Sequence, residues 1–393
     1  MKKTKLPLLL SIIVFYMVPC SQSSIYLLLG LASLLFVSCD RHQEKVAYHA
    51  VETAEIDSFM TLTGLYGGFQ LIPLENDARC MLSNVMKLVA IPEGFIIYDE
   101  SGQSNVFFFD MHGKFKGKIG DVGKNKREYV SVDDIAVDTA KREISVLTRG
   151  REIKVYDYGG QHVRSIELKA EAYLNKMCRY EEGYVCLTNH SARGDSLLCI
   201  YDDAGQLIGK KIPSLPIDIT DGSFVANPLQ TFGNQVLFVD FFQSLFNILD
   251  VDDWEQTDTY MMQTGRMFTY DEKEFENHMD LYDCILSGYL SGEKVFGWMD
   301  CNKTLSYYEM DLATKKASVL SYYDWAPPLL SFHDGHAYTI LTQEEIFALA
   351  YPSPANSSPT MEALSKAFEP YRETYTMNSN FVILKMKQKC KDF

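Results

Sequence analysis

The chain has 393 residues, of which 47% are hydrophobic, so it is long enough for one large domain or two ordinary ones. Its formal net charge is −15, which argues against nucleic acid as a partner and against electrostatic docking onto anionic lipid, because both need a basic protein surface. The 24 Tyr and 23 Phe residues favour β-strands, since aromatic side chains suit a pleated, half-buried surface.

The N-terminus has the features of a targeting segment. The basic start MKKTK is followed by apolar runs at 6–18 and 25–37, each of 13 residues and therefore too short to cross a bilayer core of ~30 Å as a helix. The sequence predicts a secretory signal peptide over 1–38. The run FVSCD at 36–40 resembles the lipobox of bacterial lipoproteins, which implies cleavage before Cys39 and its acylation. An uncleaved membrane-anchoring segment or a helical hairpin is the alternative, and both also place most of the chain outside the cytoplasm.

A folded domain is predicted over 67–389, after a mixed polar segment at 39–66 that is interpreted as a tether. Within the domain, five segments end an apolar run with Asp and continue with turn residues. Because Asp accepts hydrogen bonds from nearby backbone and Gly supplies positive φ, each segment predicts a hairpin. The Asp residues are spaced by 47, 45, 48 and 61 residues, in FDMHG (109–113), YDYGG (156–160), YDDAG (201–205), LDVDD (249–253) and MDLAT (310–314).

A second pattern of the same period indicates six repeat units. Short apolar runs of strand length follow a turn at FIIY (95–98), EISVL (143–147), YVCL (184–187), VLFV (236–239), VFGW (295–298) and AYTIL (337–341). The last unit ends at 380–387 without a final strand, and the run FQLIPL at 69–74 is available to supply it. Units of about 50 residues suit four-stranded blades. The sequence therefore predicts an all-β fold, a six-bladed β-propeller whose N- and C-terminal strands close the last blade.

Two insertions interrupt the repeat, at about 264–284 and 342–378, and short helices are predicted in both. TYDE at 269–272 has capping-box spacing, and PTMEALSKAF at 359–368 has a helical pattern. Loops on a rigid scaffold often carry binding residues, but these insertions could equally cover the core.

Four runs together resemble a known family: EGFIIYD (93–99), VFFFDMHGKF (106–115), IGDVGKNKREY (119–129) and DIAVD (134–138). They are similar to the six-bladed β-propeller lipoproteins abundant in Bacteroidetes, which are themselves similar to NHL-repeat propellers. In that family the Gly-rich run reads Gly-x-Gly-Pro-Gly-Glu-Tyr, whereas here NKR occupies 125–127. The resemblance implies a fold and an envelope location, and it transfers no catalytic residue.

Motifs for catalysis, metals or cofactors are not apparent. His333 and His336 flank an Asp-Gly turn without a third ligand nearby, and no Gly-x-Ser-x-Gly or calcium-loop spacing occurs. A phosphate-binding loop would need Ser or Thr after Lys124, where the chain has Asn125. The nine cysteines lack Cys-x-x-Cys spacing, so buried thiols are expected. We therefore predict no metal, no cofactor and no catalytic residue.

The predicted function is binding. The expected protein is a monomer, lipid-anchored to the outer membrane on either face and touching membrane through its anchor alone, that presents a scaffold to a protein, peptide or glycan. The candidate binding residues lie in the inter-blade loop, at Lys124, Lys126, Arg127, Glu128 and Tyr129, where a basic run stands in an acidic protein. The alternative is a propeller hydrolase or lyase acting on a glycan or peptide, which would place at least two groups of perturbed pKa at the centre.

Overall fold

The computed structural model describes residues 47–100, 104–188, 196–214, 227–264, 267, 283–322, 331–350, 358–376 and 378–389. The chain divides into the units Met1–Ala47 and Tyr48–Phe393, and the second contains every described element. The described residues are all-β apart from a few short helices. None of the described helices is long and apolar enough to cross a membrane. Cys39 and the helix predicted from TYDE lie outside the described residues.

Three four-stranded antiparallel sheets follow one another in the chain, each built from consecutive strands. The first sheet contains β3 (Val85–Ile91), β4 (Gly94–Asp99), β5 (Asn105–Asp110) and β6 (Phe115–Lys118). The second sheet contains β7 (Asp134–Asp138), β8 (Glu143–Thr148), β9 (Glu152–Asp157) and β10 (His162–Glu167). The third sheet contains β11 (Leu174–Tyr180), β12 (Gly183–Thr188), β13 (Ser196–Asp202) and β14 (Leu207–Pro213).

The next two groups of strands are joined into one ten-stranded sheet. One group is β15 (Leu229–Phe232), β16 (Gln235–Asp240), β17 (Leu245–Asp250) and β18 (Thr257–Met262). The other is β19 (Cys284–Ile285), β20 (Tyr289–Ser291), β21 (Lys294–Cys301), β22 (Thr304–Asp311) and β23 (Lys316–Tyr322). The strand that joins them is β1 (His49–Met60), which pairs in parallel with both β18 and β23.

The strand β1 differs from the polar tether predicted over 39–66. Its apolar and polar residues do not alternate regularly, so the sequence carries no clear strand pattern there. The pairing depends on backbone hydrogen bonds to two sheet edges. The strand also contributes to the hydrophobic core, because the Val51 side chain is fully buried between the two groups of strands. The short helix α3 (Leu62–Leu65) then leads into β2 (Tyr66–Pro73).

A closing sheet combines both ends of the domain. Its strand order is β2, β26 (Val382–Gln388), β25 (His336–Leu341) and β24 (Ser331–His333). The antiparallel pairing of β2 with β26 confirms that FQLIPL and the C-terminal run share a sheet. Between β25 and β26 lie α4 (Gln343–Ala350), α5 (Pro359–Phe368) and a 3-10 turn at Glu369–Tyr371. The helix α5 confirms the predicted one, and it buries Leu364 and Phe368, so this insertion covers core.

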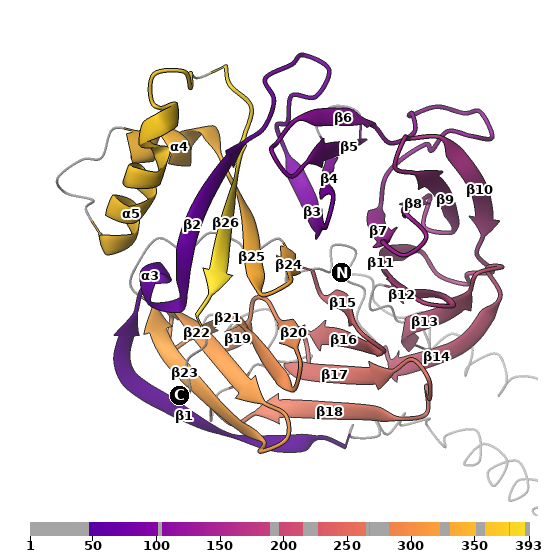
Figure 1. The fold of residues 1–393 in the computed structure, drawn as a ribbon. Coiled ribbons are helices and arrows are strands. Elements are labelled where there is room, and N and C mark those ends of the chain that lie inside the picture. The colour runs from indigo at the N-terminus through magenta and orange to yellow at the C-terminus, as the bar shows by residue number, and fades with distance from the viewer. Residues whose placement is uncertain are drawn as a thin grey trace, which may run out of the picture. The chain divides into compact units, whose positions relative to one another are not determined.

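The sheets follow one another around a common centre, and the strands that lie innermost are β3, β7, β11, β15, β20 and β24 (Figure 1). Along this centre β24 contacts β3, β3 contacts β7, β7 contacts β11, β11 contacts β15, and β15 contacts β20. The apolar core is divided into layers, each between two successive sheets. One layer, for example, packs Phe95 and Phe109 of the first sheet against Tyr338 and Ile383 of the closing sheet.

The repeated Asp–Gly turns explain how neighbouring sheets fit together. In the second sheet Asp157 accepts backbone hydrogen bonds from Gly159 and Gln161, both at 2.9 Å. This places Gly160 at φ +78, where an added Cβ would lie 2.3 Å from the carbonyl oxygen of Lys118 in the first sheet. The same close approach recurs at Gly113 against the closing sheet and at Gly205 against the second sheet. The predicted hairpin turns are therefore also the contacts between sheets.

Candidate functional site

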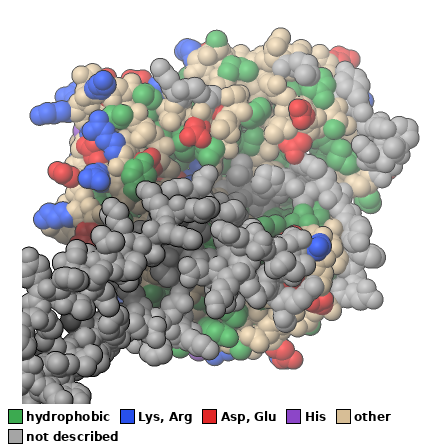
Figure 2. Space-filling view, turned by 180° about the vertical axis from the view of Figure 1, so that it is seen from behind, with side chains coloured by type: hydrophobic (Ala, Val, Ile, Leu, Met, Phe, Trp, Pro, Cys, Tyr) green, Lys and Arg blue, Asp and Glu red, His purple; other side chains and the backbone are tan. Residues whose placement is uncertain are grey.

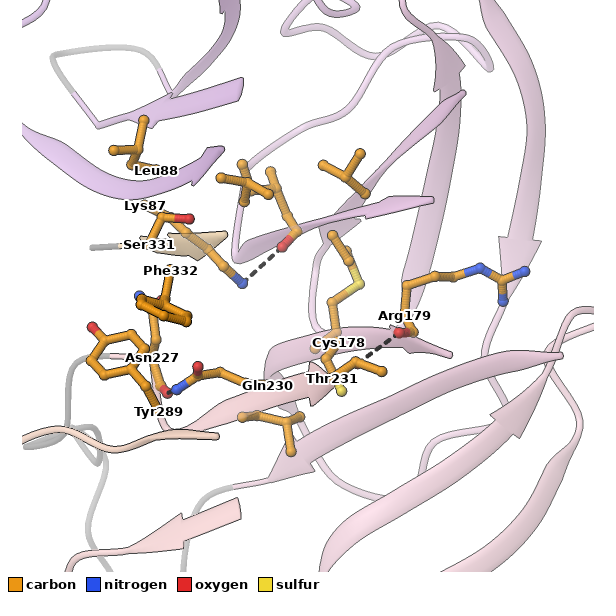
Figure 3. A pocket seen from close by; sticks show the side chains of 16 residues that line it. Lys87, Leu88, Cys178, Arg179, Asn227, Gln230, Thr231, Tyr289, Ser331 and Phe332 are labelled. Carbon is orange, nitrogen blue, oxygen red and sulfur yellow. Dashed lines mark hydrogen bonds between the residues drawn. The ribbon is translucent and has the colours of Figure 1, made fainter. Parts of the chain in front are cut away.

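The central strands of the sheets line an open pocket of about 190 Å³ (Figure 3). Each strand that contributes to it is at the edge of its sheet, so its outward backbone groups have no neighbouring strand to pair with. Residues of six strands line the pocket: Lys87, Leu88 and Val89 of β3; Ile135, Ala136 and Val137 of β7; Met177, Cys178 and Arg179 of β11; Leu229, Gln230 and Thr231 of β15; Tyr289 of β20; and Ser331 and Phe332 of β24. Asn227, which precedes β15, also lines it.

A buried ion pair connects three sheets beside this pocket. The Lys87 ammonium group lies 2.9 Å from both carboxylate oxygens of Asp134 and also donates to the carbonyl oxygen of Ile135 at 2.8 Å. The second carboxylate oxygen of Asp134 accepts the backbone N–H of Met177 at 2.8 Å. The side chains of Lys87 and Asp134 are only 15% and 2% exposed. A single carboxylate thus ties β3, β7 and β11 together.

Neutral side chains form hydrogen bonds between three other pairs of neighbouring central strands. Thr231 of β15 donates to the carbonyl oxygen of Arg179 in β11 at 2.7 Å, as Figure 3 shows. Gln230 donates to the carbonyl oxygen of Gly288, next to β20. Ser331 of β24 accepts the backbone N–H of Ala90 in β3 at 3.1 Å. Backbone groups at the sheet edges, which would cost free energy if buried without a partner, are therefore hydrogen-bonded by polar side chains of the neighbouring sheet or strand group.

The Arg179 side chain points away from the other labelled side chains of the pocket (Figure 3). It forms ion pairs with Asp203 at 2.7 Å and with Asp138 at 3.2 Å, and Lys141 also contacts Asp203 at 3.0 Å. Burial raises the pKa of Asp203, but hydrogen bonds from Lys141 and Arg179 outweigh it and hold that pKa below its usual value. This cluster joins the second and third sheets, and its cation is not available to a ligand in the pocket.

The residues that line the pocket offer little for catalysis or for binding a small molecule. Burial raises the pKa of Cys178 to about 11, so its thiol stays protonated near neutral pH and is a poor nucleophile. The pocket volume of about 190 Å³ lies below the ~300–1,000 Å³ of common small-molecule sites. Among the described residues no cluster of His, Cys, Asp and Glu could hold a metal ion.

The predicted inter-blade loop does not contribute to the pocket, and its five residues fall into two groups. The side chains of Lys124, Lys126 and Arg127 are exposed. Tyr129 is fully buried in the core between the first and second sheets. Glu128 closes the loop on itself: its carboxylate accepts the backbone N–H and the side-chain amide of Asn125, at 3.0 and 2.7 Å, and these bonds lower its pKa.

The loop geometry explains why Gly123 precedes it. An added Cβ at Gly123 would lie 1.8 Å from a carboxylate oxygen of Glu128, and the backbone N–H of Gly123 donates to the carbonyl oxygen of Tyr129 at 2.9 Å. The three positions that match the Bacteroidetes pattern, Gly123, Glu128 and Tyr129, therefore build the loop. Binding through Lys124, Lys126 and Arg127 stays a prediction.

Further exposed residues near this loop were missed from the sequence. Arg149 and Arg151 lie on the turn between β8 and β9, and Tyr173, which is 50% exposed, lies just before β11. The Tyr173 hydroxyl donates to Asp133 at 2.6 Å, and burial raises the pKa of Asp133. The only sequence signal was the basic turn TRGR at 148–151, which on its own indicates a solvated turn.

The family described as "Domain of unknown function (DUF4934)" matches residues 51–387, so the chain belongs to this family. A Bacteroides fragilis protein that is named as exported has a similar structure, with a TM-score of 0.62 and 13% identity over 87% of this chain and 100% of the other. A DUF4221 family member from Bacteroides vulgatus gives a TM-score of 0.54 and 9% identity over 83% of this chain and 98% of the other. At such identities the likeness concerns the fold. Comparison with curated proteins found no match.

Proposed function

We propose that this member of the DUF4934 family is an envelope lipoprotein whose sheets are the blades of a six-bladed β-propeller, and that it acts as a binding scaffold for a protein, peptide or glycan. The blade assignment takes the ten-stranded sheet as two blades joined by β1. It is supported by the succession of innermost strands around one centre and by the pairing of β2 with β26, which joins the two ends of the domain.

The observation that carries the binding role is how the central polar groups are used. Five side chains contact the backbone of a neighbouring sheet or strand group: Lys87, Asp134, Thr231, Gln230 and Ser331. Because these polar side chains hydrogen-bond neighbouring sheets to one another, they stabilise a rigid centre. The rigid centre then presents loops to a partner, and several of these loops carry exposed charged and aromatic side chains.

The alternative of a hydrolase or lyase has less support from the described residues. Such an enzyme needs a base or nucleophile paired with a second titratable group at one place. Of the residues lining the pocket, Cys178 has a raised pKa, which is opposite to the shift that activates a thiol. No specific observation therefore favours catalysis over binding.

The envelope location rests on the predicted signal peptide, the lipobox-like run ending at Cys39, and the export named for the B. fragilis protein of similar structure. A lipid-modified cysteine carries more than one acyl chain, which is enough for stable attachment. We propose attachment to the outer membrane, with the propeller held on a short N-terminal segment and working as a monomer.

Replacing Cys39 with Ala is expected to release the protein from membranes and to abolish labelling by a palmitate analogue. The measurement is fractionation of native-host cells together with metabolic labelling. Cys20→Ala is the matched control, because MVPC at 17–20 has Pro next to its Cys and is a poorer lipobox, so this variant should stay attached and labelled. Retention of the unlabelled Cys39→Ala protein in membranes would contradict the lipoprotein proposal and support an uncleaved anchor.

The binding role is tested by crosslinking in intact cells of the native host, followed by purification of the full-length protein and identification of what is attached. We expect a defined protein or glycan partner that is absent when an unrelated envelope lipoprotein is purified in the same way. Recovery of no partner, together with turnover of an envelope glycan or peptide by the purified protein, would overturn the binding role in favour of the enzyme.

A further inference from the structure

Five exposed cations from two separate segments form what we call the basic patch: Lys124, Lys126, Arg127, Arg149 and Arg151. Within the described residues, none of these five side chains forms an ion pair with a carboxylate. This differs from other cations of the second and third sheets, such as Arg142 with Glu93, Arg164 with Glu143 and Lys210 with Glu171, which are paired. The basic patch therefore has charge available for a ligand.

Hydrogen bonds attach the loop at 124–131 to the second sheet, whose β8–β9 turn carries Arg149 and Arg151. Along β9, Lys154 donates to the carbonyl oxygen of Lys126 and Tyr156 donates to that of Arg127, both at 2.9 Å. Just beyond, the backbone N–H groups of 130 and 131 donate to the Thr148 hydroxyl at 3.3 and 3.2 Å. The loop thus lies along the second sheet, with its backbone fixed and its basic side chains exposed to solvent. A preorganised backbone reduces the entropy lost on binding.

The basic patch carries positive charge on a protein that is acidic as a whole. The formal net charge is −15, yet the pKa of His162 is lowered, first by burial and then by the nearby Lys154 and Arg127. Figure 2, seen from behind, shows Lys and Arg side chains, with Asp and Glu side chains among them, on the side where Figure 1 places β8–β10. A local cluster of cations on an acidic protein attracts anions of limited extent and repels large polyanionic surfaces.

An aromatic side chain is next to the two arginines. Gly150, between Arg149 and Arg151, has φ +61 and packs under the Tyr173 ring, where an added Cβ would lie 2.5 Å from a ring carbon. The Tyr173 hydroxyl is held by Asp133 at 2.6 Å, while half of the residue is exposed. A fixed, half-exposed ring gives an apolar platform with little entropy to lose on binding.

We propose that the basic patch together with Tyr173 binds an anionic glycan, an oligosaccharide that carries sulfate or carboxylate groups. The cations contact the anionic groups, and the Tyr173 ring packs against the face of a sugar. The net charge of −15 disfavours long nucleic acids and anionic membranes, and the combination of ring and separate cations favours a sugar chain over an acidic peptide. This inference rests on the proposed binding role and specifies its ligand class.

The test measures binding of a heparin oligosaccharide and of oligogalacturonate to the purified full-length protein in detergent, by calorimetry at several salt concentrations. We expect binding to at least one of them that weakens as salt rises, and none to neutral dextran. Two variants, Lys124→Gln/Lys126→Gln/Arg127→Gln and Arg149→Gln/Arg151→Gln, should each lose affinity tenfold or more. The hydrogen bonds that hold these segments use their backbone groups and not the side chains that change. The circular dichroism spectrum and the melting temperature of both variants should therefore be unchanged.

Two further variants distinguish binding at the basic patch from non-specific attraction of anions to exposed cations. Lys114→Gln/Lys116→Gln removes the same charge as the arginine pair from an exposed site on the first sheet and should change affinity by less than twofold. Tyr173→Ala should weaken binding at least fivefold while leaving the salt dependence unchanged. Equal loss from the Lys114/Lys116 control, or equal binding of polyglutamate, would overturn the glycan proposal. If both anionic glycans fail while crosslinking still recovers a partner, the site inference fails and the binding role stands.

Discussion

Replacing Asp134 with Asn is expected to lower the free energy of unfolding by about 3 kcal/mol, measured by urea denaturation. The substitution keeps the shape of the side chain but leaves the Lys87 ammonium group, which is 15% exposed, without its carboxylate. Removing one partner of a buried ion pair typically costs ~3–5 kcal/mol, because the remaining charge is desolvated and uncompensated. The Met177 N–H, at 2.8 Å, would also lose a charged acceptor.

Two controls separate burial from ion pairing in general. Glu171→Gln breaks the pair between Lys210 and Glu171, in which Glu171 is 75% exposed, and should lower the free energy of unfolding far less than Asp134→Asn, because solvent screens the pair. The double variant Lys87→Met/Asp134→Asn removes both charges and should be more stable than Asp134→Asn alone. Equal losses for the buried and the exposed variants would show that Asp134 does not link the sheets as inferred.

Replacing Gly160 with Ala is expected to cost about 3 kcal/mol, measured by thermal and urea unfolding. The new Cβ would lie 2.3 Å from the carbonyl oxygen of Lys118, a backbone atom of the neighbouring sheet, and the residue would keep φ +78. The expected cost adds left-handed strain of ~1 kcal/mol to a backbone shift of ~1–3 kcal/mol.

Gly233→Ala is the matched control for this substitution. Gly233 has φ +58 in another turn between strands, but no heavy atom lies within 4 Å of the added Cβ. Its expected cost is therefore the strain alone, about 1 kcal/mol. If the two alanine variants were equally stable, the Asp–Gly turns would not be the close contacts between sheets.

Much of the fold could be predicted because each repeat has local signals. The apolar runs beginning at 95, 143, 184, 236, 295 and 337 all lie in the strand that pairs with the innermost strand of its sheet or strand group. The five Asp segments all form the next hairpin, because Asp bonds its own turn whatever surrounds it. The strand β1 was missed, since its pairing depends on two sheet edges that are distant in sequence.

The candidate site was less predictable. The basic loop at 124–127 stood out as a departure from the family pattern, and Glu128 and Tyr129 then proved to close that loop and fill the core. Arg149, Arg151 and Tyr173 were not selected, because nothing in their own segments indicates a neighbour 20 or more residues away. The buried pair of Lys87 and Asp134 was equally hidden, since single charges in strand segments normally indicate a solvated face.

The sequence by itself determined the strands, the turns, the repeat and the predicted targeting segment, because periodicity, turn chemistry and short apolar runs act between residues close in the chain. The tertiary structure decided which edges pair, which charges are buried, and which exposed side chains meet. Those outcomes depend on contacts between sheets, such as Asp134 with Lys87 and Met177, whose partners lie more than 40 residues apart. No local pattern encodes such contacts, and the proposed glycan site depends on contacts of the same kind.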